Sequence, residues 1–189
     1  TRDAGQKCLY YNNNGDGTFT RVDTTRISVM SGGNFGATAG DYDKDGDQDV
    51  FILGPTFSKG LFRNDNSNGN GWVDITCKGV GAPTGSNLSA IGTIVRTKAV
   101  INGSPVWQIR QVAAQNSFNC QNALNIHFGF GDATVIDSLE IRWPSGIIDV
   151  YTGVTINSFY NAVEGMSLDP VGVENISNII PILNFSFFI

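Results

Sequence analysis

An acidic loop that runs directly into a short apolar segment constrains this chain more than any other feature. Residues 41–49 read DYDKDGDQD, so five aspartates fall within nine residues and only Lys44 offsets their charge. Carboxylates this close repel by roughly 1 kcal/mol per pair at 4 Å in water, and by about four times as much near a protein surface. A hard divalent cation removes the repulsion, and calcium accepts about six to eight oxygen ligands in a flexible geometry. The loop therefore predicts a calcium site, with a solvated acidic turn as the alternative.

The flanking residues distinguish this loop from an EF-hand. An EF-hand requires a bidentate Glu at the twelfth position, where this chain has Ile52, and a helix on either side. Residues 50–53 are instead β-branched and aromatic, which is typical of a buried strand. Gly46 permits the sharp bend that a loop between two strands needs in order to wrap an ion.

The alternation of aspartates predicts the ligand set. Successive carboxylates at every second position turn inward, and the final carboxylate has to come early because no acidic residue follows in the strand. The predicted Ca²⁺ ligands are the carboxylates of Asp41, Asp43, Asp45 and Asp49 and the main-chain carbonyl of Asp47.

Composition predicts an all-β protein without a polymeric nucleic acid partner. Only 15% of the 189 residues are charged, 23 are glycine, and no long stretch repeats apolar residues with a helical period. Few helix formers and many β-branched and turn residues favour strands. The net charge of −5 argues against a nucleic acid partner, which would need a basic face. No apolar run reaches the ~18 residues that span a bilayer.

Turn signals divide the chain into three predicted parts. Residues 1–68 contain an Asn-Gly/Asp-Gly hairpin at 12–17 and the acidic loop, and a polar, glycine-rich stretch at 65–71 marks the boundary. Residues 69–164 contain a series of strands, including 72–77 and 120–128, with a tight turn at Asn102-Gly103. Residues 165–189 are predicted to be a linker followed by an apolar tail.

Two families resemble these parts. FGA at 35–37 with GDYD at 40–43 resembles the FG-GAP/VCBS repeat of integrin-type β-propellers, whose loop binds calcium for structural reasons. In the second half SAIGT at 89–93, QIRQV at 108–112, HFGFG at 127–131 and LEIRWPSG at 139–146 resemble the ASPIC/UnbV domain. The resemblance implies a partial β-propeller blade region packed with a β-sandwich or barrel-like domain. It also implies a secreted or cell-surface protein of a bacterium.

Incomplete blades raise the question of what covers the sheet edges. A propeller closes with about four to eight blades, and this chain carries one and a fraction. The edges are therefore expected to be covered by the following domain or by neighbouring copies, unless the chain is a fragment of a longer protein. The apolar tail at 179–189 either packs on its own domain or inserts beside a strand of the next molecule, which would build a homo-oligomer.

No catalytic motif emerges from the sequence, so we expect a protein that is not an enzyme. The single histidine, His127, lies between apolar residues and is expected to be structural. The favoured function is a secreted, calcium-binding structural or adhesive protein that contacts carbohydrate or matrix and assembles into filaments. The alternative is a non-catalytic accessory domain of a larger secreted enzyme, which binds carbohydrate. The odd number of cysteines leaves their pairing open, with Cys77–Cys120 as one candidate disulfide.

Overall fold

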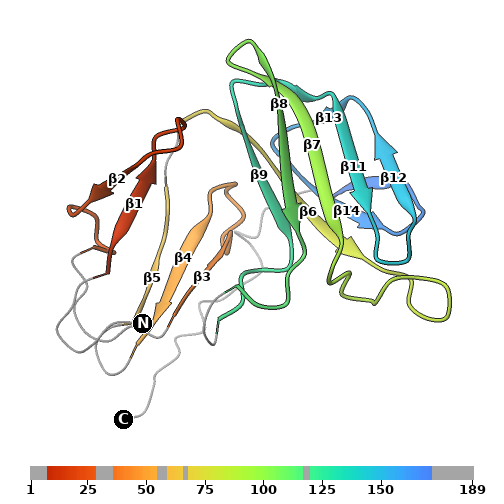
Figure 1. The fold of residues 1–189 in the computed structure, drawn as a ribbon, viewed down its shortest axis with the longest axis horizontal. Coiled ribbons are helices and arrows are strands. Elements are labelled where there is room, and N and C mark those ends of the chain that lie inside the picture. The colour runs from red at the N-terminus through yellow and green to blue at the C-terminus, as the bar shows by residue number, and fades with distance from the viewer. Residues whose placement is uncertain (1–7, 29–35, 55–58, 66–67, 117–119, 172–189) are drawn as a thin grey trace, which may run out of the picture.

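The structure, a computed structural model, describes residues 8–28, 36–54, 59–65, 68–116 and 120–171. These residues form β-strands and connecting loops, and none of them lies in a helix (Figure 1). The predicted all-β class is therefore confirmed. The apolar tail at 179–189 and its predicted strand insertion lie outside the described residues.

A hairpin comes first in the described chain. Strands β1 (Tyr10–Asn13) and β2 (Phe19–Val22) pair in antiparallel fashion. In the turn between them Gly15 and Gly17 have φ angles of 82° and 86°. Glycine adopts these angles without steric cost, so the turn forms where the sequence predicts it.

The acidic loop belongs to a three-stranded antiparallel sheet, here called the N-terminal sheet. Its order is β3 (Gly36–Gly40), β4 (Asp49–Leu53) and β5 (Gly60–Phe62). The predicted strand at 50–53 is confirmed and begins one residue earlier. Of its apolar side chains only Ile52 is buried. Phe51 and Leu53 lie on the other face of the strand and are each 40% exposed.

The rest of the chain forms two four-stranded sheets that pack face to face, here called the sandwich (Figure 1). One sheet has the order β12 (Ile148–Tyr151), β11 (Ser138–Arg142), β7 (Ile94–Ile101) and β8 (Ser104–Gln111). The other has the order β15 (Leu168–Val171), β14 (Ser158–Val163), β6 (Gly71–Lys78) and β9 (Ile126–Gly131). The short strands β10 (Val135–Ile136) and β13 (Val154–Thr155) pair with each other.

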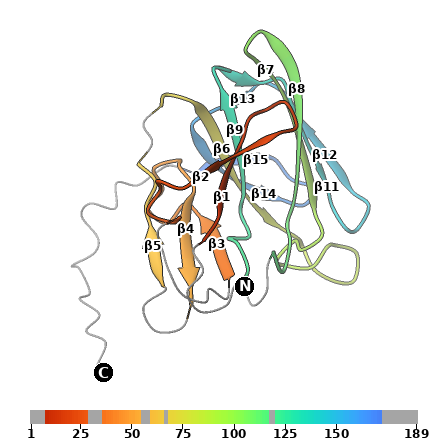
Figure 2. The same ribbon diagram turned by 60° about the vertical axis from the view of Figure 1, so that its left-hand side comes forward.

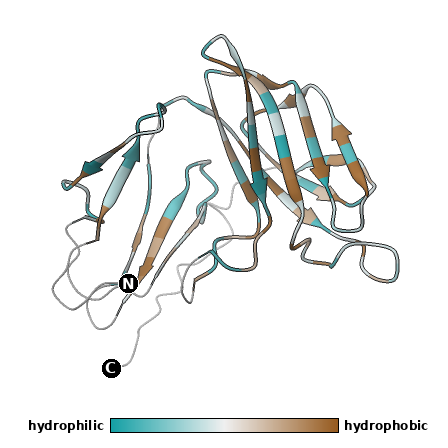
Figure 3. Cartoon of the chain, viewed as in Figure 1, coloured by the Kyte–Doolittle hydropathy of each residue, from teal (hydrophilic) through white to brown (hydrophobic). Residues whose placement is uncertain are grey.

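One apolar core lies between these two sheets. Side chains alternate along the strands between core and solvent, which produces the alternating brown and teal bands of Figure 3. Val73, Val95, Phe128, Leu139 and Ile141 are all completely buried in this core. The fold therefore combines a small antiparallel N-terminal sheet with a β-sandwich, and the predicted β-sandwich is confirmed.

Two sequence predictions about strands need correction. Residues 120–128 were expected to form one strand, but β9 begins only at Ile126, because the preceding residues bond to the edge of β3 instead. The predicted linker and tail begin at residue 165, yet Leu168–Val171 forms β15 and pairs with β14. The sandwich thus continues to Val171.

The cysteines form no disulfide between Cys77 and Cys120. Cys77 is buried in the core and Cys120 is half-buried, and both carry free thiols. Burial raises the pKa of the Cys77 thiol to about 12. The candidate Cys77–Cys120 disulfide is therefore wrong.

Candidate metal centre

Asp49 organises the loop between β3 and β4. Its side chain is at the first position of β4 and the residue is 2% exposed. Oδ2 accepts a hydrogen bond from the Tyr42 N–H at 3.0 Å, and Oδ1 accepts one from the Asn64 N–H at 2.9 Å. Asp49 therefore connects the start of the loop to the residues that follow β5.

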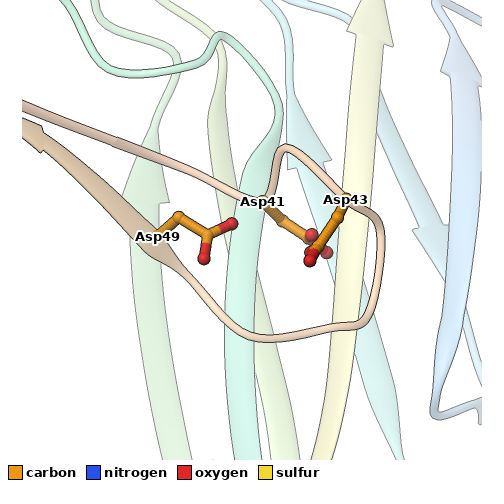
Figure 4. Close-up of side chains that lie close together, drawn as sticks. All are labelled: Asp41, Asp43 and Asp49. Carbon is orange, nitrogen blue, oxygen red and sulfur yellow. The ribbon is translucent and has the colours of Figure 1, made fainter. Parts of the chain in front are cut away.

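Asp41 and Asp43 place carboxylate oxygens inside the loop without hydrogen-bond partners. Oδ2 of Asp41 accepts a hydrogen bond from the Gly46 N–H at 2.9 Å. Oδ1 of Asp41 and Oδ1 of Asp43 are buried and have no partner among the described residues. A buried acceptor without a donor costs about 1–3 kcal/mol and more when it is charged. Figure 4 shows both carboxylates side by side within the loop, with Asp49 directed toward the same space.

The separation of these three carboxylates matches a single bound ion. One oxygen from each of Asp41, Asp43 and Asp49 lies within 4.8 Å of the other two. Oxygens that bind calcium at about 2.3–2.6 Å cannot lie more than about 5 Å apart. The donors are all hard oxygens, so the residues present fit calcium.

The electrostatics of the loop disfavour its ionised form. Burial raises the pKa of Asp41 above its ordinary value and outweighs the hydrogen bond from Gly46. The pKa of Asp43 is also raised, first by burial and then by the charges of Asp45 and Asp49. A positive charge in the loop would reverse both effects.

Asp45, another predicted ligand, does not belong to the cluster of Asp41, Asp43 and Asp49. The Asp45 side chain is exposed, and its Oδ1 accepts a hydrogen bond from the Asp47 N–H at 2.9 Å. Asp45 joins a second group of close carboxylates with Asp43 and Asp65. The main-chain carbonyl of Asp47 stays a predicted ligand.

Arg63 is a neighbour that the sequence did not reveal. Its Nε lies 2.7 Å from Asp65 Oδ1, and its Nη1 lies 3.7 Å from Asp43 Oδ2. Arg63 follows β5, so only the pairing of β5 with β4 brings it to the loop. It supplies part of the positive charge that the loop requires.

Comparison with known protein families now identifies both parts of the chain. Residues 3–52 match the FG-GAP-like repeat, and residues 83–168 match the ASPIC and UnbV family. The chain thus contains a match to the FG-GAP-like repeat followed by a match to the ASPIC/UnbV domain, in the predicted order. FG-GAP-like repeats are typical of extracellular β-propeller-like proteins. No curated protein shows significant similarity to the chain. In the described part of the chain no helix is long and apolar enough to cross a membrane.

The loop of the FG-GAP-like repeat packs directly on strand β6 of the sandwich. Gly46 has a φ of 95°, and a Cβ at this position would lie 2.1 Å from the Trp72 indole. Trp72 is held in turn by Phe159, at 4.9 Å between ring centroids, and by stacking on His127 at 6.4 Å. Gly46 is therefore required both for the bend of the loop and for its contact with β6.

The edge of β3 is covered by the ASPIC/UnbV domain. Asn122 Oδ1 accepts a hydrogen bond from the Ala39 N–H at 2.9 Å, and the Ala123 N–H donates to the Ala39 carbonyl at 3.0 Å. The Thr38 hydroxyl donates to the Gln121 carbonyl. Figure 2 shows the N-terminal sheet beside the sandwich. The expectation that the following domain covers a blade edge is confirmed for β3.

Glu164 is a second buried carboxylate that sequence reasoning missed. It is 3% exposed, accepts hydrogen bonds from the Val80 and Ser86 N–H groups at 3.0 and 2.7 Å, and accepts others from the hydroxyls of Ser86 and Ser145. Its donors lie up to 84 residues away along the chain, so no local pattern indicates the cluster. Through these bonds one carboxylate connects Val80, Ser86 and Ser145.

Proposed function

We propose that the protein is a secreted, calcium-binding structural protein whose ion holds the acidic loop against the ASPIC/UnbV domain. The observation that supports this is the pair of buried, unpartnered oxygens of Asp41 and Asp43 beside Asp49. The carboxylates of these three residues would hold the ion. The ion would supply positive charge and rigidity, and no bond-making chemistry.

Calcium would also stabilise the contact between the two regions. Gly46 both donates to Asp41 and touches Trp72, so an ordered loop presents a defined surface to β6. The N-terminal sheet has few buried apolar side chains, so its stability depends on this loop and on the β3 edge. A saturating ion at about 100 times its Kd adds about 2.7 kcal/mol to the free energy of unfolding.

Calcium titration of wild-type protein and of Asp41→Asn tests the proposal. We expect calcium to raise the melting temperature of the wild type and EDTA to reverse the rise. Asp41→Asn should bind calcium at least about tenfold more weakly, a loss of about 1.4 kcal/mol. Isothermal calorimetry and thermal unfolding measure both effects.

Asp137→Asn is the matched control, because Asp137 is exposed, lies outside the loop and makes the same change in charge. It should keep the wild-type affinity. A wild-type protein that calcium neither binds nor stabilises would refute the calcium role.

We also propose a non-catalytic role. The His127 imidazole stacks on Trp72, and its Nδ1 lies 3.8 Å from Asp74 Oδ2, which is too far for a hydrogen bond. Asp74 is instead bound by Asn125, whose Nδ2 is 2.6 Å from each carboxylate oxygen. These contacts support a structural histidine.

Self-assembly through a sheet edge is the further part of the proposed function. Among the described strands β5 pairs with β4 alone, and Leu61 on β5 is 52% exposed. An unprotected edge of this kind can add a strand from another copy. A lysine on the edge opposes such pairing, so Leu61→Lys should lower the assembled fraction by at least about half.

Light scattering and negative-stain images at increasing protein concentration measure assembly. Leu88→Lys is the control, because Leu88 is 65% exposed in a loop rather than on a sheet edge. Wild-type protein that stays monomeric at all concentrations would rule out assembly.

A further inference from the structure

A polar pocket lies where the acidic loop meets the ASPIC/UnbV domain, separate from the three clustered aspartates. Its volume is about 300 Å³, and its polar lining residues are Gln48, Arg110, Gln111, Asn116, Asn122, Asn125 and His127. No Asp or Glu of the described residues lines it.

Hydrogen-bond donors are in excess on this wall. Asn122 Oδ1 accepts the Ala39 N–H at 2.9 Å, and Asn116 Oδ1 accepts the Asn122 N–H at 3.0 Å. Each of these amide oxygens therefore already accepts a backbone N–H, and neither Nδ2 group donates a hydrogen bond to another described residue. Gln48 Nε2 is buried and has no partner among the described residues.

Arg110 adds a positive charge that no carboxylate of the described residues neutralises within ion-pair distance. Its guanidinium lies over the Phe128 ring, 5.2 Å from the centroid, and Nη1 donates to the Ile109 carbonyl at 2.9 Å. The side chain is therefore oriented by the protein, while its remaining N–H groups are available. A planar guanidinium binds carboxylates in two-point fashion.

Asn125 offers the pocket a hydrogen-bond acceptor rather than a donor. Both oxygens of Asp74 lie 2.6 Å from its Nδ2, so its Oδ1 is the atom left to accept a hydrogen bond. A ligand that suits this wall offers acceptor oxygens with negative charge toward Arg110 and the amide donors, and a hydroxyl toward Asn125. A volume near 300 Å³ is at the lower end of ligand pockets and suits one small molecule.

We propose that this pocket binds a hydroxylated carboxylate the size of one sugar unit, namely a hexuronate. The carboxylate pairs with Arg110, and the ring hydroxyls bond to the amides of Gln48, Asn116, Asn122 and Asn125. The same chemistry is present in a free hexuronic acid and at the end of an acidic polysaccharide. The proposal does not depend on calcium in the loop.

Binding of sodium glucuronate to the full chain tests the proposal, with ¹⁵N–¹H NMR titration in calcium-containing buffer as the readout. Glucose, sodium phosphate and a glucuronate-ended oligosaccharide are titrated in parallel. We expect glucuronate to bind at least about tenfold more tightly than glucose or phosphate, a difference of about 1.4 kcal/mol. Tighter binding of the oligosaccharide than of the monosaccharide identifies the polymer as the source, and equal binding identifies the free acid.

Arg110→Gln should weaken glucuronate binding by at least about tenfold. Arg142→Gln is the matched control, because Arg142 pairs with Glu140 on β11 and makes the same change in charge. Gln48→Met keeps the size of the side chain, removes a pocket donor and should weaken binding severalfold. It provides a second test if Arg110→Gln fails to fold.

Three results would overturn the proposal. These are absence of glucuronate binding, equal affinity for glucose or phosphate, and equal losses in Arg110→Gln and Arg142→Gln. Calcium titration of the same samples is read separately, so failure here leaves the calcium proposal intact.

Discussion

Buried carboxylates in the sandwich and in the acidic loop are stabilised in different ways. Glu164 accepts hydrogen bonds from Val80, Ser86 and Ser145, so the protein itself satisfies its oxygens. Asp41 and Asp43 each keep one buried oxygen without any donor among the described residues. The carboxylate in the sandwich thus has its hydrogen-bond donors within the fold, whereas the two loop carboxylates keep oxygens without a donor among the described residues.

The pKa values follow the same division. For Glu164 burial raises the pKa, but the hydrogen bonds from Ser145, Val80 and Ser86 outweigh it, and the pKa falls to about 2. For Asp41 burial prevails and the pKa is raised. Hydrogen-bond donors supplied by the fold therefore decide whether a buried carboxylate favours its ionised form.

The two regions also differ in how many apolar side chains they bury. The sandwich buries Phe128, Phe130 and Ile141 completely, whereas Ile52 is the one fully buried apolar side chain in the described strands of the N-terminal sheet. We therefore expect the two regions to differ in what destabilises them. The predictions below test that difference, beginning with the largest effect.

Phe128→Ala should lower the free energy of unfolding by about 4 kcal/mol, because it leaves a cavity in the core. Urea unfolding measures the loss. Because the N-terminal sheet packs against the sandwich at β3 and at Trp72, both regions should unfold together. Ile148→Ala is the control, since Ile148 is 54% exposed. A loss of unfolding free energy below about 1.5 kcal/mol in Phe128→Ala would contradict the view that the apolar core stabilises the sandwich.

Glu164→Ala should cost about 3 kcal/mol at neutral pH, because four donors lose a charged acceptor. The lowered pKa makes this contribution pH-dependent. It is fully present above the ordinary pKa of 4.5 and is lost as the pH falls toward about 2.

Acid titration of wild-type protein and of Glu164→Ala, followed by circular dichroism, should show their stability difference shrinking across that window. A difference that stays constant down to pH 2 would show that the lost contacts, rather than the charge, account for the cost.

Gly46→Ala should lower stability by about 2 kcal/mol, because it combines a strained φ with overlap on Trp72. Gly146→Ala separates the two causes. Gly146 has a φ of 97°, nearly equal to the 95° of Gly46, and a Cβ at this position would meet no atom within 4 Å. The control should lose about 1 kcal/mol from strain alone.

Tryptophan fluorescence provides a second readout for Gly46→Ala, since Trp72 is the overlapped residue. The emission should shift only in Gly46→Ala. Equal losses of stability in both variants, with unchanged emission, would show that the contact between Gly46 and Trp72 does not hold the two regions together.

The local sequence determined the strands, the turns and the acidic loop. Asn102-Gly103 forms the turn between β7 and β8 with φ angles of 50° and 73°, as two residues that tolerate positive φ should. The aspartates at 41, 43 and 49 come together because alternation and one glycine bend act over nine neighbouring residues. Interactions of this range are encoded in short stretches of chain.

Tertiary structure alone decided what the loop and the buried acids contact. Ala39 bonds to Asn122 at a separation of 83 residues, and Glu164 bonds to Val80 at 84. Residues 121–123 bond to Thr38 and Ala39 on the edge of β3, and β9 begins only at Ile126. No local pattern specifies such a partner, because the bonded groups lie more than 80 residues apart in the chain.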